Sequence, residues 1–378
     1  IYIFIKKMPI DWEQRKLGEI CSRVQGNDGR MELPTLTISA ANGWMKQEDR
    51  FSGNIAGKEQ KNYTLLHKGE LSYNHGNSKL KKYGTVFSLQ TYEEALVPRV
   101  YHSFKVEIGS ADFIEYYFAT KMPDRELRKL ISSGARMDGL LNIGYDDFMG
   151  IKMMFPSVLE QDKIAECFRA FDHLITLHQH KCDETKKLKK CMLQKMFPKN
   201  GKKVPEIRFD GFANDWEQRK LGDIIEVCSG RDYKHLEDGN IPVYGTGGYM
   251  LSVSEALSND DDAIGIGRKG TIDKPYILKA PFWTVDTLFY CIPKDNYDLY
   301  FVFDIFQNIN WKAMDESTGV PSLSKTVINK VETLVPNFSE QQKIGNYFRN
   351  LDHLITLHQH KCDELQNLKK YMLQNMFV

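Results

Sequence analysis

A chain of 378 residues is too long for one ordinary domain and predicts two or three. Hydrophobic residues make up 42% and charged residues 27% of it, so the chain can build packed cores and is not a disordered protein. It holds no run of about 18 uncharged apolar residues, which predicts no transmembrane helix, and its net charge of +1 argues against gripping nucleic acid by bulk charge alone.

The N-terminal residues predict no secretion signal. The apolar run 1–5 is short, and Lys6 and Lys7 follow it, which reverses the charge-then-apolar order of a signal peptide. The seven cysteines include no C-x-x-C pair, and an odd number without tight spacing is typical of reduced thiols. We therefore expect a cytoplasmic protein with no membrane partner.

Two segments of the chain each occur twice. Residues 11–18 recur without change as residues 215–222. Residues 160–197 recur as residues 340–377, with 27 of 38 positions identical. Identical segments predict that the same structural role is filled twice.

The blocks between the repeats, residues 19–159 and 223–339, show only weak similarity. One trace of it is residues 133–141 against residues 317–323. Divergent blocks of similar size on one frame predict related but distinct functions. The alternative is an old duplication whose two halves have diverged without selection for different functions. Such divergence alone would not keep one segment nearly identical while the adjoining blocks lost their similarity.

Hydrophobic periodicity predicts mixed elements in both blocks. In the first block we expect strands at residues 35–39, 84–89 and 99–106 and a helix at residues 113–130. In the second block we expect strands at residues 263–267 and 284–292 and a helix at residues 299–310. Each block is therefore expected to be a compact α+β domain.

The repeated segment 160–197 predicts a long helix, because it contains neither Gly nor Pro. A helix of this length spans about 57 Å. Ser157 stands three residues before Glu160, and Ser339 stands three residues before Gln342. This spacing predicts a capping box at the start of each copy.

Apolar and small residues recur along both copies in steps of four and three, the spacing of a coiled-coil seam. The expected seam contacts are Ile164, Phe168, Ile175, His178, Ile344, Phe348, Ile355 and His358. Because the two seams are equally apolar, each helix is the natural partner of the other. An antiparallel arrangement brings His178 and His358 together near the centre.

Cys182 and Cys362 are expected close to these histidines, which permits two interpretations. Histidine and cysteine side chains are zinc ligands. A polar break in an apolar seam also fixes the register of a helix pair. Without further C-x-x-C or H-x-H context, we expect the second role and no metal site.

Charge is spread unevenly along the chain. The first block carries 18 basic and 17 acidic residues, and the second carries 10 and 17. The second block can bind a polyanion only if its few basic residues cluster on one face, or if partner subunits make the contacts to the phosphates. A basic run in the repeated helix is expected to be a solvated face rather than a DNA or subunit contact; its members are Lys186, Lys187, Lys189, Lys190 and Lys195.

Loops rich in Gly, Asn, Lys and Tyr interrupt both blocks, at residues 73–83, 244–248 and 267–271. Glycine lets the backbone approach a ligand closely, Arg and Lys reach phosphates or guanine edges, and Asn reads adenine. Tight turns between strands are the competing interpretation of each loop. The Gly-Thr-Gly-Gly sequence lacks the spacing of nucleotide-binding loops, and we find no convincing catalytic constellation.

Three motifs resemble those of the specificity subunits of type I restriction-modification enzymes. The motif Trp-Glu-x-x-x-Leu-Gly-[Glu/Asp]-Ile opens each block, at residues 12–20 and 216–224. The motif Pro-x-x-x-Glu-Gln-x-Lys-Ile enters each long helix, at residues 156–164 and 336–344. The preamble Val-Pro-Glu-Ile-Arg-Phe-Asp-Gly-Phe at residues 204–212 is also typical, and the first repeat lacks it.

The resemblance implies an α+β chain in which two α/β target-recognition domains are joined by two long antiparallel coiled-coil helices with pseudo-two-fold symmetry. Each domain would read one half of a split, asymmetric DNA site, and the helices would set the spacing. The expected boundaries are 1–155 for the first domain, 156–198 for the first long helix, 199–214 for a linker, 215–336 for the second domain and 337–378 for the second long helix.

The resemblance also implies a non-catalytic chain without a cofactor of its own. The implied partners are double-stranded DNA, two methyltransferase subunits and two restriction-translocase subunits. S-adenosylmethionine, ATP and Mg would be bound by those subunits. The family's DNA-facing loops map approximately onto Asn74, Asn77, Lys79, Lys81, Lys82, Tyr83 and Arg136 in the first domain, and onto Tyr244, Thr246, Gly247, Arg268, Lys269, Thr271, Ser322 and Lys325 in the second.

Two other functions compete with DNA recognition. A coiled-coil scaffold that binds proteins and no DNA would carry the same repeats and helices. A gel shift of the chain with its methylating partner on DNA distinguishes that scaffold from a DNA reader. An enzyme acting on a small molecule is suggested only by the glycine loops, and the lack of a catalytic cluster weighs against it.

Overall fold

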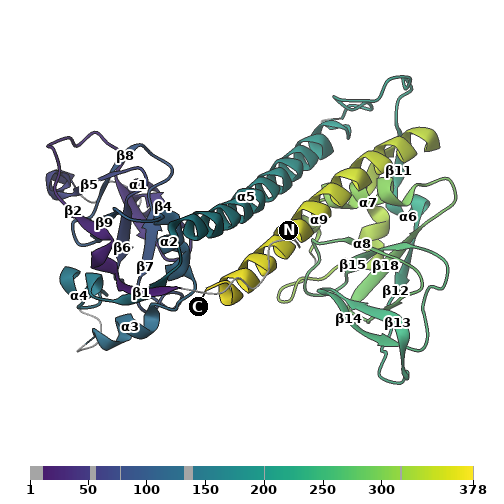
Figure 1. The fold of residues 1–378 in the computed structure, drawn as a ribbon. Helices are drawn as coiled ribbons and strands as arrows, with labels where there is room; N and C mark the ends of the chain where they lie inside the picture. The colour runs from purple at the N-terminus through teal and green to yellow at the C-terminus, as the bar shows by residue number, and fades with distance from the viewer. Residues whose placement is uncertain are drawn as a thin grey trace. The chain divides into compact units, whose positions relative to one another are not determined.

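The computed structural model of the chain describes residues 12–51, 57–76, 78–131, 139–199, 201–315 and 317–377. They divide into two compact units, whose elements are labelled in Figure 1. The first unit combines the described residues up to Leu177 with those from Cys362 onward, and the second comprises His178–Lys361. Each unit therefore holds one mixed domain and one end of each of two long helices.

The two long helices are α5 (Val158–Lys195) and α9 (Phe338–Asn375), each of 38 residues. They coincide with the two copies of the repeated segment, which confirms the predicted helices. Across the described parts of the chain, no helix is both long enough and apolar enough to cross a membrane.

The first turns of the two long helices are capped by different residues. Ser157 Oγ accepts the N–H of Glu160 at 3.4 Å, as the sequence predicts. In the second copy, Asn337 Oδ1 accepts the N–H of Glu340 at 3.0 Å. The predicted cap at Ser339 is wrong, because Asn337 occupies the position equivalent to Ser157 and Ser339 lies inside the helix.

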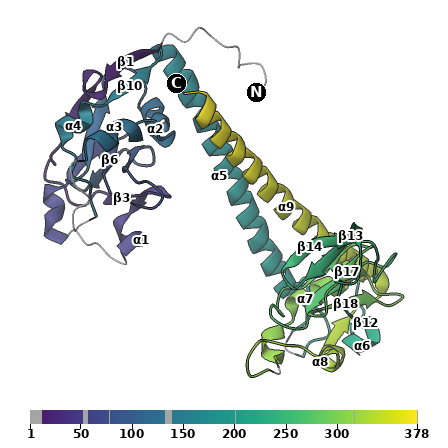
Figure 2. The same ribbon diagram turned by 90° about the horizontal axis from the view of Figure 1, so that it is seen from below.

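Ion pairs show that α5 and α9 run in opposite directions. In the first unit, Lys369 Nζ lies 2.5 Å from Asp172 Oδ1. In the second unit, Lys189 Nζ lies 2.6 Å from both carboxylate oxygens of Asp352. The two lysines are equivalent positions of the repeat, and so are the two aspartates. In each unit the two helices therefore run antiparallel, as predicted (Figures 1 and 2), and the same pair of repeat positions makes the contact.

The aromatic residue just after each long helix packs into the domain of the unit where that helix ends. The ring neighbours of Phe377 in the first unit include Trp12, Phe113 and Phe168. The ring neighbours of Phe197 in the second unit are Trp216, Phe301 and Phe348. The repeated Asp-Trp motif therefore supplies the tryptophan against which the other helix ends.

The two copies of the glutamate in the helix-entry motif have different partners. Trp12 Nε1 donates to Glu160 Oε1 at 3.3 Å. Glu340 is instead bound by the guanidinium of Arg208, at 2.7 and 2.8 Å. Trp216 Nε1 is buried without a hydrogen-bond partner among the described residues. The arginine of the preamble thus replaces the tryptophan as the partner of this glutamate.

Each domain is built on a four-stranded antiparallel sheet with the same strand order. In the first domain the order is β2 (Cys21–Val24), β9 (His102–Val106), β6 (Leu71–Asn74) and β7 (Thr85–Ser88). In the second it is β12 (Ile225–Ser229), β18 (Leu288–Pro293), β15 (Ala263–Gly267) and β16 (Tyr276–Leu278). The helices packed against these sheets are α2 (Ala111–Ala119) and α7 (Leu299–Asn308).

Smaller sheets complete each domain. In the first, the pairs are β1 (Glu13–Lys16) with β10 (Lys152–Phe155), β3 (Leu36–Ser39) with β4 (Gly43–Lys46), and β5 (Thr64–His67) with β8 (Glu94–Val97). In the second, β11 (Glu217–Lys220) pairs with β19 (Glu332–Val335), and β13 (Asp238–Gly245) lies between β14 (Gly248–Val253) and β17 (Trp283–Thr284).

Short helical segments connect the strands. The α-helices are α1 (Gln47–Phe51), α3 (Asp124–Lys129), α4 (Tyr145–Met149), α6 (Leu221–Ile224) and α8 (Lys325–Lys330). The 3₁₀ turns are η1 (Leu17–Glu19), η2 (Gly57–Asn62) and η3 (Trp311–Met314).

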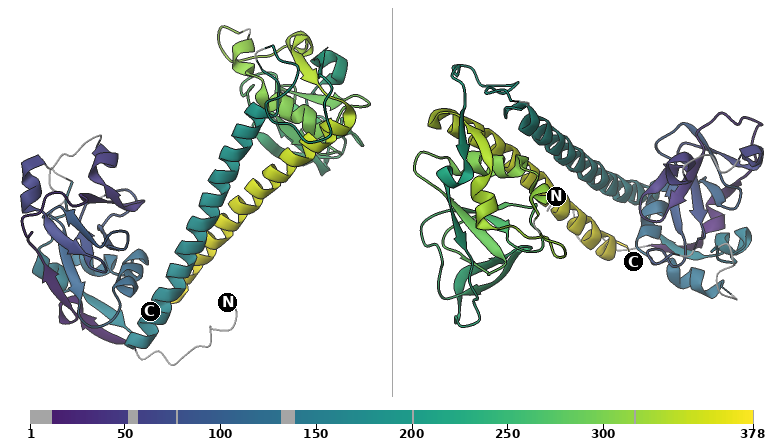
Figure 3. Two further views of the ribbon diagram at one scale, coloured as in Figure 1. Left: turned by 90° about the horizontal axis from the view of Figure 1, so that it is seen from above. Right: turned by 180° about the vertical axis from the view of Figure 1, so that it is seen from behind.

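In the second unit, the end of α5 and the start of α9 both pack against the domain drawn in green (Figure 3).

Two predicted elements are split in the structure. The helix expected over residues 113–130 is α2 and α3, because Lys121 adopts φ +67° and Pro123 follows it. The strand expected over residues 284–292 is β17 and β18, because the N–H of Leu288 donates to Val285 O in a turn. The other predicted strands and the helix at α7 are confirmed.

A glutamine ties each long helix to its domain and explains the repeated Glu-Gln dipeptide. Gln341 Nε2 donates to Pro336 O at 3.0 Å, and its Oε1 accepts the N–H of Asp298, the residue before α7, at 3.1 Å. Gln161 makes the same two kinds of bond in the first unit. The side chain of Gln341 therefore holds the start of α9 against the start of α7.

We predict that Gln341→Ala lowers the free energy of unfolding by about 1–3 kcal/mol, because the variant leaves a buried N–H and a buried carbonyl without partners. Urea denaturation measures the change. Gln342→Ala is the matched control, because Gln342 is the exposed neighbour on the same helix turn. Equal stability of the two variants would contradict the role given to Gln341.

Candidate nucleic-acid interface

Three loops of the second domain that the sequence singled out come together in the structure. The turn Thr246–Gly247 joins β13 to β14 as a two-residue hairpin loop, because Gly245 pairs with Gly248. The segment 268–271 follows the central strand β15, and the segment 321–325 leads into α8. The first loop is therefore a tight turn between strands as well as a candidate contact, whereas the second belongs to a longer connection between β15 and β16.

Backbone hydrogen bonds join the second and third loops. The N–H of Gly270 donates to Pro321 O at 2.8 Å, and the N–H of Leu323 donates to Arg268 O at 2.9 Å. The first loop lies alongside, because a Cβ added to Gly270 would stand 3.9 Å from Thr246 Oγ1. The three loops therefore form one continuous surface, called here the second reading surface.

The predicted residues of the second reading surface differ in exposure. Arg268, Lys269 and Gly247 are exposed, and the half-buried members are Tyr244, Thr246, Thr271, Ser322 and Lys325. Arg268 Nη1 donates to Asp286 O at 3.3 Å, so its guanidinium is partly held by the protein. Lys269 carries an exposed ammonium and is the freer of the two cations to meet a phosphate.

Two predicted contacts have structural roles. The ring of Tyr244 packs beside Tyr249 and Tyr276, with centroids 6.3 and 6.1 Å away. The backbone N–H of Ser322 donates to Asp315 Oδ1 at 2.9 Å, as do the N–H and hydroxyl of Ser317. These hydrogen bonds lower the pKa of Asp315, since they favour its ionised form, and they close the loop before α8.

The first domain places its predicted residues on the loop between β6 and β7. Ser78 and Lys81 close a tight turn, with the N–H of Ser78 donating to Lys81 O at 3.2 Å. Lys79 and Lys82 are exposed on this turn, so the turn and the candidate contacts coincide. Burial lowers the pKa of Lys81, and the positive charge of the nearby Lys121 lowers it further.

Other predicted residues of the first domain are held inside it or are not described. Asn74 Nδ2 donates to Ile38 O at 3.2 Å, and its Oδ1 accepts the N–H of Gly76 at 3.0 Å, so this amide serves the fold. The carbonyl of Tyr83 accepts the hydroxyl of Tyr73 at 2.6 Å. Asn77 and Arg136 lie outside the described residues.

The loop after β6 in the first domain and the loop after β15 in the second make the same backbone hydrogen bond. The N–H of Leu141 donates to His75 O at 2.8 Å, as Leu323 does to Arg268. The bridge between Gly76 and Leu140 matches that between Lys269 and Ser322. The weak sequence similarity that ends at Leu141 and Leu323 therefore marks equivalent positions.

One loop at an equivalent position escaped the sequence analysis. Residues 40–42 join β3 to β4 as Thr246–Gly247 join β13 to β14, and Gly43 and Gly248 both adopt positive φ, +69° and +106°. The dipeptide Asn42–Gly43 was the available signal, since Asn-Gly favours hairpin turns.

The sequence also did not single out His75, a histidine that packs against the loops of the first domain. His75 is 6% exposed, with Nδ1 2.7 Å from Leu141 O and Nε2 2.8 Å from Val100 O. Its ring stacks on His102 at 4.9 Å between centroids. Burial lowers the pKa of His102. His75 thus joins the loops that follow β6, β8 and α3.

Comparison with known proteins gives a family to this arrangement. Residues 213–367 match the family described as "Type I restriction modification DNA specificity domain". All three loops of the second reading surface lie inside this match. Residues 213–367 are therefore similar to a type I restriction-modification DNA specificity domain.

Whole-chain comparisons agree with this assignment. The type I restriction enzyme MjaVIII specificity subunit of Methanocaldococcus jannaschii is 20% identical over 302 residues, which cover 69% of this chain and 68% of the relative. The crystal structure of the type I restriction-modification S subunit from M. genitalium matches 99% of this chain and 98% of that one, at 16% identity and a TM-score of 0.70. The chain therefore has the fold of a type I specificity subunit, as expected from the sequence.

A further solved structure, titled for complex assembly and conformational transition of the type I R-M system, covers 97% of this chain and 98% of that one. Its identity to this chain is 13% and its TM-score is 0.50.

The specificity fold places the predicted seam on the buried sides of α5 and α9. Of these residues, Ile164 and Phe168 are buried in the first unit, Ile344 and Phe348 are buried in the second, and the half-buried ones are Ile175, His178, Ile355 and His358. The Nδ1 atoms of His178 and His358 lie 3.0 Å apart, which confirms that these histidines meet. Burial and the neighbouring His358 lower the pKa of His178.

The basic run on α5 is partly neutralised. Lys189 pairs with Asp352 and Lys195 with Glu206, whereas Lys186, Lys187 and Lys190 are exposed. No group of three or more His, Cys, Asp or Glu side chains positioned to hold a metal ion occurs in the part of the chain that the structure describes.

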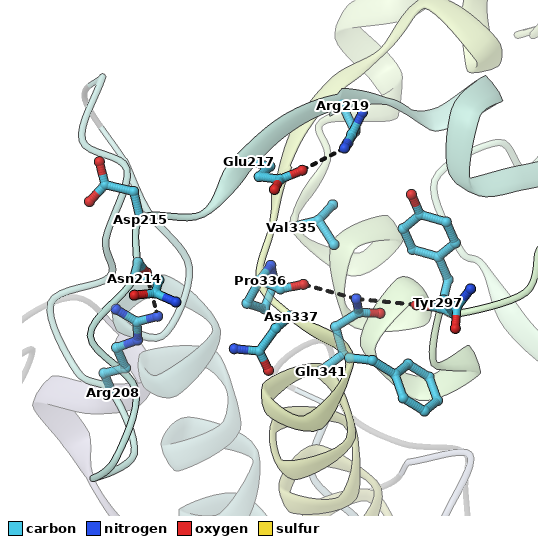
Figure 4. Close-up of a pocket in the computed structure, with 12 residues that line it drawn as sticks. Arg208, Asn214, Asp215, Glu217, Arg219, Tyr297, Val335, Pro336, Asn337 and Gln341 are labelled. Carbon is cyan, nitrogen blue, oxygen red and sulfur yellow. Dashed lines mark hydrogen bonds and ion pairs between the residues drawn. The ribbon is translucent and has the colours of Figure 1, made fainter.

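A polar cavity of about 260 Å³ lies where the preamble, β11 and the start of α9 meet (Figure 4). Its lining includes Arg208, Arg219 and Gln341. Arg208 donates to Asn214 O, and Arg219 pairs with Glu217. Because Arg208 and Gln341 already anchor α9, we assign this cavity a structural role.

We predict that His75→Ala lowers the free energy of unfolding by about 1–3 kcal/mol, because the variant loses the hydrogen bond of a buried imidazole and the stacking of its ring on His102. It should also speed hydrogen exchange at residues 139–145, which His75 holds to the loop after β6. The control is His67→Ala, since the side chain of His67 is 54% exposed. Unchanged exchange at residues 139–145 would contradict this role.

Proposed function

We propose that this chain is the DNA-reading subunit of a type I restriction-modification complex, in which each domain reads one half of a split, asymmetric site. The observation that carries this proposal is the common plan of the two domains. Both use the same sheet order and the same loop connections, yet the loops carry different residues. His75 in the first domain stands where Arg268 stands in the second.

The chemistry of the loops supports DNA as the ligand. Lys79 and Lys82 in the first domain, and Lys269 in the second, are exposed cations on turns. Such side chains position a protein on phosphates, while side chains and backbone groups near the base edges specify sequence. Gly247 leaves room for close approach, because no heavy atom lies within 4 Å of a Cβ added there.

We further propose that the chain is non-catalytic and works with partner subunits. Two methyltransferase subunits that bind S-adenosylmethionine would modify adenine, and two restriction-translocase subunits would use ATP and Mg. The excess of acidic residues in block 223–339 supports a need for partners, because that domain has few cations with which to hold a polyanion. A cytoplasmic location accords with the seven cysteines, none of which forms a disulfide.

The long helices would set the distance between the half-sites. Each is 38 residues long, or about 57 Å. Half-sites one turn apart need reading centres about 34–36 Å apart, which helices of this length can hold.

The assembled complex of this chain with its methyltransferase subunits tests the proposal. We expect methylated adenines in a two-part asymmetric sequence when the host genome is sequenced for modified bases. On a duplex with that sequence, Lys269→Ala should weaken binding and lower the slope of log affinity against log salt by about one, because one phosphate contact is lost.

Lys330→Ala is the matched control, because Lys330 is an exposed cation of the same unit outside the reading loops. A complex that methylates no defined sequence and shifts no duplex would contradict DNA reading and favour the protein-binding scaffold.

A further inference from the structure

Three large apolar side chains are exposed around the second reading surface. The exposed fractions are 63% for Tyr249, 49% for Met250 and 66% for Val320. Exposed apolar residues scattered singly over a surface need no explanation. These three, however, come from two segments that the fold brings to one place.

Contacts place Met250 and the segment that carries Val320 at the edge of that surface. Met250 Sδ lies over Gly245, since a Cβ added there would stand 2.8 Å from the sulfur. Tyr249 precedes Met250 on β14, so its side chain points to the other face of the strand, where its ring packs beside Tyr244. Val320 precedes Pro321, whose carbonyl accepts the N–H of Gly270. Met250 and Val320 therefore flank the turn Thr246–Gly247 and the loop that carries Lys269.

The backbone between these side chains is open. No heavy atom lies within 4 Å of a Cβ added to Gly247 or Gly319, and neither glycine has positive φ. The chain therefore does not need glycine there for its own conformation. A ligand that approaches the backbone closely would need it.

Charge indicates how this domain obtains specificity. Block 223–339 holds 10 basic against 17 acidic residues, so attraction to phosphates contributes little there. On the base edges of the major groove, the apolar group is the 5-methyl of thymine, and apolar side chains discriminate bases by contacting it. A surface with exposed Met and Val side chains and few cations matches that group.

We propose that Met250 and Val320 read thymine methyl groups in the half-site bound by the second domain. This inference rests on the proposed function and adds to it the chemical group that is recognised. It makes these two residues determinants of specificity that the sequence analysis did not select.

Removal of single methyl groups from the DNA tests the inference. The chain, assembled with its methyltransferase subunits, is titrated with duplexes in which each thymine of that half-site is replaced in turn by deoxyuridine. We expect at least one replacement to weaken binding about three- to fivefold, as loss of one buried methyl implies. Met250→Ala or Val320→Ala should bind the thymine duplex more weakly and show no further loss with deoxyuridine.

Val204→Ala is the control, because Val204 is an exposed apolar residue of the same unit outside the loops. It should keep the full response to deoxyuridine. No loss at any thymine, an undiminished loss in both alanine variants, or a half-site without thymine would each overturn this inference alone. Failure of the variants to assemble with the methyltransferase subunits would overturn it in favour of a protein contact. No sequence-preferring binding at all would overturn the proposed function as well.

Discussion

The antiparallel pairing of two copies of one helical segment is the constraint on which the rest of the structure depends. Because the copies share a sequence, one contact between them generates a second by symmetry, and the structure shows both: Lys369 with Asp172, and Lys189 with Asp352. The side chains of both lysines are largely buried, at 22% and 11% exposed. A shift in register would leave these cations unpaired, which is costly for a buried charge. The ion pairs therefore fix register as well as direction.

Each domain folds around one end of this helix pair, so the parts that meet the helices must stay alike. Trp12 and Trp216 receive the end of the opposite helix, and Gln161 and Gln341 hold the start of the adjoining one. The loops at the reading surfaces, by contrast, carry different residues in the two domains, with His75 at the position of Arg268. Substitution there changes which side chains are presented, while the common sheet order is retained.

The sequence predicted the helices and most strands because local periodicity determines them. The sequence did not predict the cap at Asn337, because Asn337 and Ser339 are both plausible N-cap residues of α9. It also did not predict the break at Lys121, which depends on a positive φ. It selected Lys79 and Lys269 by residue type, but their placement depends on bridges between distant segments, such as Lys269 with Ser322. Met250 and Val320 could not be found from sequence, because apolar residues are ordinarily expected in a core. The hydrogen bond from Asn74 to Ile38 likewise depends on a contact between distant segments.

Cross-linking of introduced cysteines tests the pairing most directly. A short bifunctional thiol reagent, with the linked peptides mapped by mass spectrometry, is applied to the double variants Asp172→Cys/Lys369→Cys and Lys189→Cys/Asp352→Cys. Asp172→Cys/Asp352→Cys is the comparison, since these equivalent positions meet only if the helices run in the same direction. The antiparallel frame predicts intrachain links in the first two variants and none in the third. Links in the third variant, or in none of them, would contradict it.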